Sequence, residues 1–296
     1  MKKLPIDYDH PLYRPPGESD NLIIQATLGC SYNQCSFCAM YRGKHYQARP
    51  LEQVYADIDA AAQDWPDARR LFLADGDALA LPTPHLLQLL DYLALRLPRM
   101  TRVSCYATPA NIRRKSTAEL AQLRAHKLSL LYVGIESGSA LILKKITKGA
   151  TPHGITAALH QAHAAGMRIS ATVILGLGGR EYSTEHITGT LALLNSAPLT
   201  QLSTLQLYLD DGMQSEFAHK FGTPFALPDD HALLYEQRRL VAGLMPPQAI
   251  VFRSDHASNA LALQGVLPRD RTRLLAAIDA ARAGRRPLRP PHQRGL

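Results

Sequence analysis

Short apolar segments alternate with helical patterns along the first two-thirds of the chain, and this alternation constrains the fold more than any other feature. Six segments have the length and the β-branched content of strands: 22–27, 71–74, 102–107, 130–134, 169–175 and 202–208. Strands separated by helices pair in parallel through right-handed crossovers. The sequence therefore predicts an α/β fold with a mainly parallel sheet, either open or closed as a barrel, whose ligands bind at the carboxyl ends of the strands.

The helical segments carry clear start and stop signals. Thr83 is a candidate cap of a helix that has Pro84 at its first position and leucines at helical spacing, and Ser116 with Glu119 forms a capping-box pattern. Gly166 stands where a helix should end. After residue 210 the alternation stops, and we expect only helices near 229–243 and 268–283 with an irregular stretch between them.

Composition and charge exclude several classes of protein. No stretch approaches the roughly 18 apolar residues of a membrane helix, and no apolar segment follows the lysines at the amino terminus, so we expect a cytoplasmic location. Much of the formal charge of +8 lies at the end, where residues 282–296 hold five arginines and no acid. Such a tail could touch RNA, but the sequence contains no recognisable RNA-binding module.

Three of the four cysteines lie within nine residues, directly after the first predicted strand. Cys30, Cys35 and Cys38 form a C-x4-C-x2-C loop whose thiolates can meet at the carboxyl end of that strand. Thiolates at this spacing suit a [4Fe-4S] cluster, and three protein ligands leave one iron open to a chelating molecule. Two alternatives stay open: a structural zinc site, which needs a fourth ligand, and a group of small buried residues.

This loop, with Phe37 one residue before the last cysteine, resembles that of the radical SAM superfamily, whose commoner spacing is C-x3-C-x2-C. The core is similar to those of the oxygen-independent coproporphyrinogen dehydrogenases and the Elp3-type domains. The resemblance implies a partial (β/α)6 TIM-type barrel of mainly parallel strands with a C-terminal helical and irregular extension. We then expect a radical SAM core at 1–210, an extension at 211–283 that caps the barrel, and a basic, disordered tail at 284–296.

Further segments match the order of the superfamily's SAM-binding motifs. The resemblance implies seven such residues: Gly76 and Asp77 near the methionine amino group, Ser104 near SAM or substrate, Glu136 and Ser137 near the ribose or the ammonium group, and Gly176 and Gly178 against the adenine. Simpler interpretations are an ordinary Asp-Gly turn and an acid at a helix N-terminus. The glycines match neither a G-x-G-x-x-G fingerprint nor a P-loop, so a dinucleotide site is not expected.

The resemblance also implies an activity. An electron from a donor such as flavodoxin or ferredoxin would drive cleavage of S-adenosylmethionine (SAM), and the resulting 5′-deoxyadenosyl radical would take hydrogen from a substrate. We predict a small-molecule substrate; the alternatives are an RNA- or peptide-modifying enzyme and a zinc-stabilised binding protein. Residues 250–268 are either a polar surface loop or the source of two catalytic residues, Arg253 to bind an acid group and His256 to move a proton.

Overall fold

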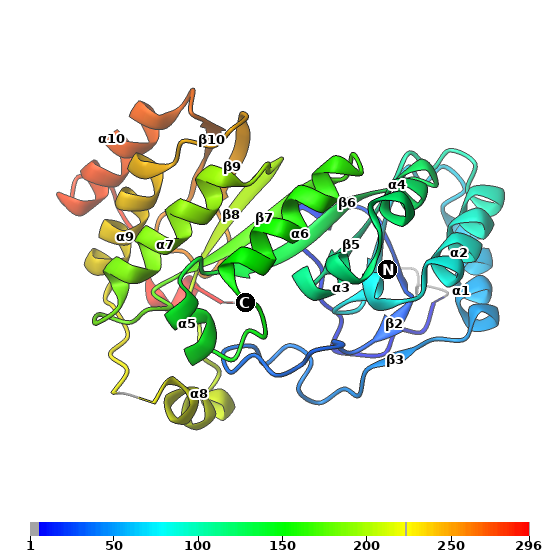
Figure 1. Cartoon of the computed structure of the whole chain (residues 1–296), viewed down its shortest axis with the longest axis horizontal. Coiled ribbons are helices and arrows are strands. Elements are labelled where there is room, and N and C mark those ends of the chain that lie inside the picture. The colour runs from blue at the N-terminus through cyan, green and yellow to red at the C-terminus, as the bar shows by residue number, and fades with distance from the viewer. Residues whose placement is uncertain (1–5, 223, 296) are drawn as a thin grey trace. The chain divides into compact units, whose positions relative to one another are not determined.

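The structure is a computed structural model that describes residues 6–222 and 224–295. The chain forms two compact units and passes between them several times (Figure 1). The first unit comprises Met1–Asn33, Met40–Val133 and Gln161–Arg168, and the second comprises Gln34–Ala39, Gly134–His160 and Ile169–Leu296. Each unit combines a sheet with helices, which confirms the predicted α/β class.

The sheet of the first unit is parallel, with its strands in the order β1, β4, β5, β6. Its principal elements are β1 (Leu22–Gln25), β4 (Arg70–Ala74), β5 (Arg102–Ala107), β6 (Leu128–Glu136), α1 (Leu51–Asp64), α2 (Thr83–Arg96), α3 (Pro109–Arg114) and α4 (Thr117–Ala125). A short antiparallel pair, β2 (Thr27–Leu28) and β3 (Gln47–Ala48), joins the two ends of the cysteine loop.

The helices of the first unit follow most of the signals in the sequence. Thr83 is the first residue of α2 and not its cap, because the N-cap is Pro82 and the Thr83 hydroxyl donates to Glu119 instead. α4 begins with the predicted capping box, in which Ser116 and Glu119 bind each other's backbone N–H groups. α2 buries its leucine stripe, because side chains three and four residues apart share one face of a helix. Tyr55 of α1 stacks on Tyr92 of α2, with 4.0 Å between the ring centroids.

The strands of the second unit lie in the order β7, β8, β9, β10; the first two pairings are parallel and the last is antiparallel. Its principal elements are β7 (Arg168–Leu175), β8 (Gln201–Gln206), β9 (Ile250–Ser254), β10 (Leu263–Leu267), α5 (Ala140–Lys145), α6 (Pro152–Ala164), α7 (Ser183–Ser196), α8 (Gln214–Phe221), α9 (Asp230–Gly243) and α10 (Arg271–Arg282). Within the described residues, no helix has the length and apolar character needed to cross a membrane.

The structure differs from the sequence-based expectation at 250–268, where β9 and β10 replace most of the irregular stretch. One face of β9 is buried, with Phe252 fully buried, whereas Arg253 on the other face is exposed. Because more exposed residues alternate with buried apolar ones, the sequence of β9 lacks the continuous apolar run that predicted the other strands.

The last residues of the chain contact the second unit. Arg289 donates hydrogen bonds to the carbonyl oxygens of His256, Ala257 and Asn259, at 2.8–3.1 Å. The guanidinium of Arg294 pairs with both carboxylate oxygens of an aspartate in α9. The predicted boundaries at 210 and 283 stay predictions.

Candidate functional site

None of the four cysteines forms a disulfide, but their surroundings differ. Cys105 on β5 has no exposed surface, and burial raises the pKa of its thiol. Cys30, Cys35 and Cys38 are half-buried. Thiols that bind metals lie in partly exposed positions near positive charge, whereas fully buried thiols are inert. The three loop thiols therefore have the accessibility of ligands, and Cys105 does not.

Cys30 belongs to the first unit, where the turn after β4 lies against it. Gly76 N–H donates to the carbonyl oxygen of Gly29 at 3.1 Å. A Cβ on Gly76 would lie 2.9 Å from the Cβ of Cys30 and 2.7 Å from the ring of Tyr41, so no larger residue fits without a shift of its neighbours. The structure thus brings one predicted SAM-binding residue to one predicted ligand.

Asp77 is fully buried on the same turn. Its Oδ2 accepts hydrogen bonds from the side chains of Ser31 and Asn111. Burial raises the pKa of Asp77 to about 6, and the hydrogen bond from Ser31 offsets only part of that effect. The carboxyl of Asp77 therefore links Ser31, which follows Cys30, to Asn111 of α3. Its raised pKa makes it a candidate functional group.

A second carboxyl on this turn was missed by the sequence reasoning. Asp75 Oδ2 accepts hydrogen bonds from Gly29 N–H at 3.1 Å and from Lys44 Nζ at 3.0 Å. Burial raises the pKa of Asp75, and the hydrogen bond from Lys44 opposes this. The aspartate thus holds residues from both ends of the cysteine loop. No spacing pattern in the sequence predicts the contact between Lys44 and Asp75, because the two residues are 31 positions apart.

Cys35 and Cys38 belong to the second unit and form a single turn, in which Cys38 N–H donates to the carbonyl oxygen of Cys35 at 3.2 Å. The turn is tied to the segment after α5, because Ser36 N–H donates to the carbonyl oxygen of Ile146 at 3.0 Å. This segment carries Lys148, two residues further on.

The ammonium group of Lys148 lies 2.8 Å from Oε1 of Glu136, and both side chains are nearly buried. Burial alone would lower the pKa of Lys148, but the charges of Glu136 and then of Cys35 and Cys38 outweigh that effect and raise it. The lysine therefore stays protonated and places a positive charge near two of the loop thiols. Sequence reasoning did not identify this lysine.

Glu136, the last residue of β6, and Ser137 form a sharp turn at the end of the strand, where Glu136 has a positive φ of 63°. Ser137 O–H donates to Nδ1 of His186 at 2.8 Å, and Nε2–H of this histidine donates to the carbonyl oxygen of Ile174 at 2.9 Å. The carbonyl requires the proton on Nε2, so Nδ1 is the acceptor. Both predicted residues thus have protein partners, and their contacts with SAM stay predictions.

His186 gives a pH-dependent stability that can be measured. Burial lowers its pKa to about 4, below the ordinary value of 6.5, so between these pH values the unfolded chain binds a proton that the folded chain does not. Stability should fall as the pH falls through this window. In urea titrations, His186→Gln should reduce the stability lost between pH 7.5 and 5 by about 2 kcal/mol. Parallel pH profiles for the two proteins would contradict this prediction.

Gly176 and Gly178 follow β7 and allow close contacts with other segments. A Cβ on Gly176 would lie 2.8 Å from the Leu233 side chain, and one on Gly178 would lie 2.6 Å from the carbonyl oxygen of Tyr182. Both glycines therefore serve packing within the protein, and the predicted contact with adenine stays a prediction.

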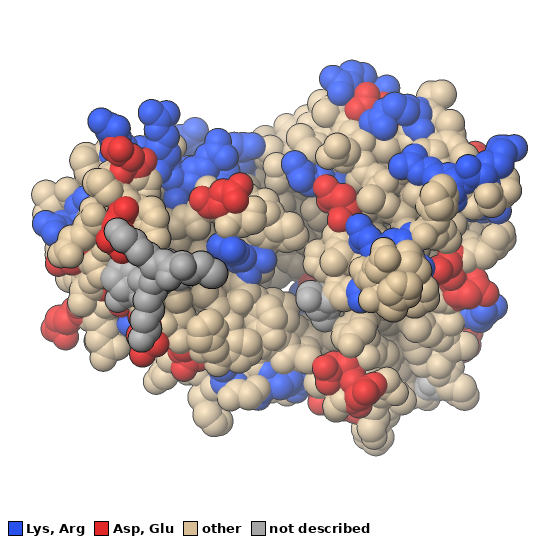
Figure 2. Space-filling model, turned by 180° about the vertical axis from the view of Figure 1, so that it is seen from behind, with Lys and Arg blue, Asp and Glu red and all other residues tan. Residues whose placement is uncertain are grey.

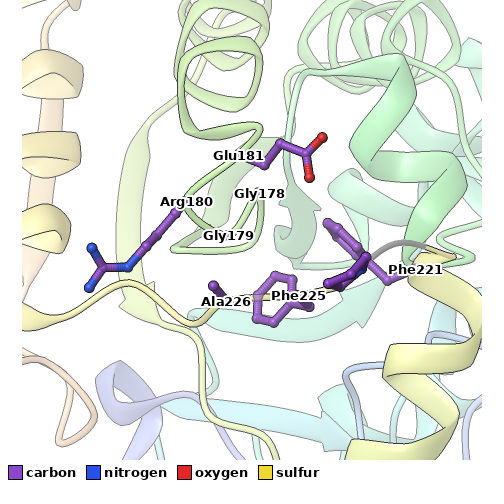
Figure 3. A pocket seen from close by; sticks show the side chains of 8 residues that line it. Gly178, Gly179, Arg180, Glu181, Phe221, Phe225 and Ala226 are labelled. Carbon is purple, nitrogen blue, oxygen red and sulfur yellow. The ribbon is translucent and has the colours of Figure 1, made fainter.

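A cavity of about 340 Å³ lies next to these glycines (Figure 3). Its lining includes Gly178, Gly179, Arg180, Glu181, Phe221 and Phe225. In Figure 3, Phe225 lies opposite the Gly178–Gly179 turn while the guanidinium of Arg180 points away. Glycine backbone and phenyl rings make walls that suit a flat, apolar group.

Three other predicted residues have separate environments. Ser104 is fully buried in the first unit, and its hydroxyl donates to Glu18 at 3.0 Å. Arg253 in the second unit is exposed and lies 3.5 Å from an oxygen of Asp255. His256 accepts the backbone N–H of Ser258 on Nδ1 at 3.1 Å, and burial lowers the pKa of this histidine. The structure therefore gives Ser104 a structural partner and leaves the roles of Arg253 and His256 as predictions.

The donor set can be compared with the requirements of a cluster. In the part of the chain that the structure describes, no group of three His, Cys, Asp or Glu side chains is gathered where it could hold a metal ion. The chemistry of the loop nevertheless fits, because it offers three half-buried thiols outside any disulfide and a lysine charge that acts on two of them. Cys30, Cys35 and Cys38 are the residues that would hold the cluster.

Comparison with known proteins gives an independent test. The family model described as the radical SAM superfamily matches residues 24–194, which is more than half of the chain and includes the whole cysteine loop. No curated protein sequence matches the chain significantly.

Several solved structures share the fold. Coproporphyrinogen III oxidase (HemN) from Escherichia coli is similar with a TM-score of 0.57 and 17% identity, over 75% of this chain and 51% of that one. Elp3 of Methanocaldococcus infernus gives 0.53 and 14%, over 90% and 64%, and methylornithine synthase (PylB) gives 0.52 and 14%, over 76% and 63%. The chain thus spans less than two-thirds of the length of these proteins.

The family match and the structural similarity agree with the α/β fold, for which a partial barrel is consistent. The chain belongs to the radical SAM superfamily, whose members are enzymes that use a [4Fe-4S] cluster and SAM, and this confirms the predicted family and cofactors.

Proposed function

We propose that this chain binds a [4Fe-4S] cluster through Cys30, Cys35 and Cys38 and cleaves SAM reductively. The bound cluster and SAM would supply a 5′-deoxyadenosyl radical, which takes a hydrogen atom from a substrate carbon. We further propose an external one-electron donor of the flavodoxin or ferredoxin type, because the sequence has no second cysteine cluster that could relay electrons.

The observation that carries the proposal is the charge beside the cysteine turn of the second unit. The charges of Cys35 and Cys38 act on the ammonium group of Lys148, and a cation near a cysteine favours the thiolate, which is the form that binds metal. Glu136, at 2.8 Å, holds this ammonium in place and keeps it charged. A set of merely buried cysteines would not need a cation that is itself costly to bury.

The other residues would act by position. Gly76 lets the turn after β4 approach Cys30, and the cavity beside Gly178 has walls that suit the adenine ring of SAM. Glu136 pairs with Lys148, whose charge acts on the cysteine turn. We propose that Glu136 binds the ribose or the ammonium group of SAM. We do not assign Ser104 to this site, because its hydroxyl already donates a hydrogen bond to Glu18.

The substrate is proposed only as a class. The sequence favours a small molecule, with RNA or a peptide as the alternative. One of the similar structures is a coproporphyrinogen III oxidase, but identities of 14–17% support a shared fold and not a shared substrate.

The experiment that tests the proposal is anaerobic reconstitution of the full chain with iron and sulfide, followed by addition of SAM and dithionite. We expect a brown protein with iron and sulfide in equal amounts, and 5′-deoxyadenosine with methionine as products. Retention of zinc in place of iron would instead favour the zinc-stabilised binding protein. An intact cluster that leaves SAM whole would refute the proposed cleavage while leaving the metal assignment in place.

A further inference from the structure

Four polar residues lie side by side across the sheet of the second unit. Thr172 on β7 pairs in register with Ser203 on β8. Ser203 in turn pairs with Arg253 on β9, and Arg253 pairs with Gln264 on β10. Register partners point to the same face of a sheet. All four are at least partly exposed, whereas Phe252 on the opposite face is fully buried. The row is therefore a polar track on one accessible face.

A cavity of about 310 Å³ lies at the β10 end of this track. Its lining includes Val251, Arg253, Gln264, Arg269, Asp270 and Arg273. The three arginine side chains are 50%, 73% and 61% exposed, and each also pairs with an aspartate: Arg253 with Asp255, and Arg269 and Arg273 with Asp270. The lining thus holds three cations and a single anion, and its electrostatic potential favours negatively charged ligands.

The outer edge of β10 is capped by side chains of the same cavity. Asp270 accepts the backbone N–H of Val266 at 2.8 Å, and Arg273 donates to the carbonyl oxygen of Gln264 at 2.7 Å. These contacts occupy the groups with which an added peptide strand would pair. The arrangement therefore disfavours a peptide that binds by extending the sheet.

The C-terminal segment that includes two of the cavity arginines, Arg269 and Arg273, is strongly basic. Residues 269–296 contain eight arginines and two aspartates, a formal charge of +6 out of +8 for the whole chain. Arg285 and Arg286, just after α10, are exposed. Figure 2 shows Lys and Arg side chains, with some Asp and Glu among them, on the part of the surface where Figure 1 places α10 and β10, and other Lys and Arg side chains elsewhere on the same face.

We propose that this surface, made of the cavity over β9 and β10 and the exposed arginines of residues 269–286, binds the phosphate backbone of an RNA strand. An exposed arginine holds a single small anion only weakly, but a chain of phosphates contacts several arginines at once and releases its counterions. Arg253 lies on the cavity wall beside Gln264, between the polar track and the arginines of α10 and its N-terminal loop.

The polar track favours RNA over DNA. Thr172, Ser203 and Gln264 continue from Arg253 as uncharged hydrogen-bonding groups, and the 2′-hydroxyl of RNA supplies a donor and an acceptor at each nucleotide. This inference goes beyond the proposed SAM cleavage, since binding needs neither a cluster nor SAM.

The test is the anisotropy of a labelled single-stranded RNA of mixed sequence, about 20 nucleotides long, titrated with the full chain at several salt concentrations. The triple variant Arg253→Gln, Arg269→Gln, Arg273→Gln should bind at least about tenfold more weakly, with a salt slope reduced by about 2. A matched control, Arg96→Gln, Arg99→Gln, Arg113→Gln, removes the same charge from exposed positions of the first unit and should keep the wild-type slope.

Further arms identify the partner. Replacing the three cavity arginines by lysine should restore most of the affinity, because lysine still contacts phosphates, and this restoration would separate charge from folding defects. Equal weakening by both glutamine triples, or no weakening by the cavity triple, would overturn the proposal. Binding to anionic vesicles without binding to RNA would also overturn it, and equal affinity for single-stranded DNA would refute the RNA assignment.

Discussion

Replacing Cys35 by alanine should remove the cluster and reduce the formation of 5′-deoxyadenosine by at least about a thousandfold, because the cofactor supplies the radical chemistry. Three thiolates are the smallest protein set that holds a cubane with one open iron, and loss of one leaves two irons without protein ligands. The measurement is iron and sulfide content after anaerobic reconstitution, together with the yield of 5′-deoxyadenosine from SAM and dithionite.

Cys105→Ala is the matched control, since it removes a thiol with no exposed surface. It should keep the cluster and the cleavage of SAM, and it should cost about 1–2 kcal/mol of stability through the lost packing. A Cys35→Ala protein with full iron content would contradict the ligand assignment, as would loss of the cluster from Cys105→Ala in a protein that still melts cooperatively.

The fold was predictable where its elements had local patterns. The strand expected at 102–107 is β5 with the same bounds, because its β-branched and apolar residues are almost all buried. The strand pair at the cysteine loop, β2 with β3, was missed because each strand is only two residues long. β9 and β10 were missed because exposed polar residues such as Arg253 and Gln264 interrupt their apolar pattern.

The candidate site, like the fold, has parts that the sequence predicted and parts that it did not. The cysteines and the order of the motifs were readable, because spacing is a property of the sequence itself. The partners were not: Lys148 meets Glu136 across a gap of 12 residues, and His186 meets Ser137 across 49. Both contacts depend on the turn at the end of β6, where Glu136 adopts a positive φ of 63° that no propensity favours for glutamate. Non-local contacts of this kind require the folded chain.

The turn that carries Glu136 and Ser137 touches the backbone of α7 directly, so Gly138→Ala should be strongly destabilising. A Cβ on Gly138 would lie 2.6 Å from both the carbonyl carbon of Gly189 and the Cα of Thr190. Backbone atoms cannot move aside as a side chain can, and overpacking of this kind costs about 3 kcal/mol. We expect this loss in the free energy of unfolding measured in urea. Gly43→Ala, with no atom within 4 Å of the added Cβ, should change stability by less than about 0.5 kcal/mol.

Gly189→Ala tests the same contact from the α7 side. Helix propensity and packing predict changes of opposite sign in the free energy of unfolding of this variant. Helix propensity alone predicts stabilisation of about 1 kcal/mol, because Gly189 lies inside α7. Packing predicts net destabilisation of about 2 kcal/mol, since the new Cβ would lie 2.8 Å from the carbonyl oxygen of Gly138 and 2.9 Å from the Cα of Ser139. A more stable Gly189→Ala protein would mean that the turn and α7 are not in contact. A less stable one that also loses SAM cleavage out of proportion to its folded fraction would tie this contact to the position of Glu136 and its lysine partner.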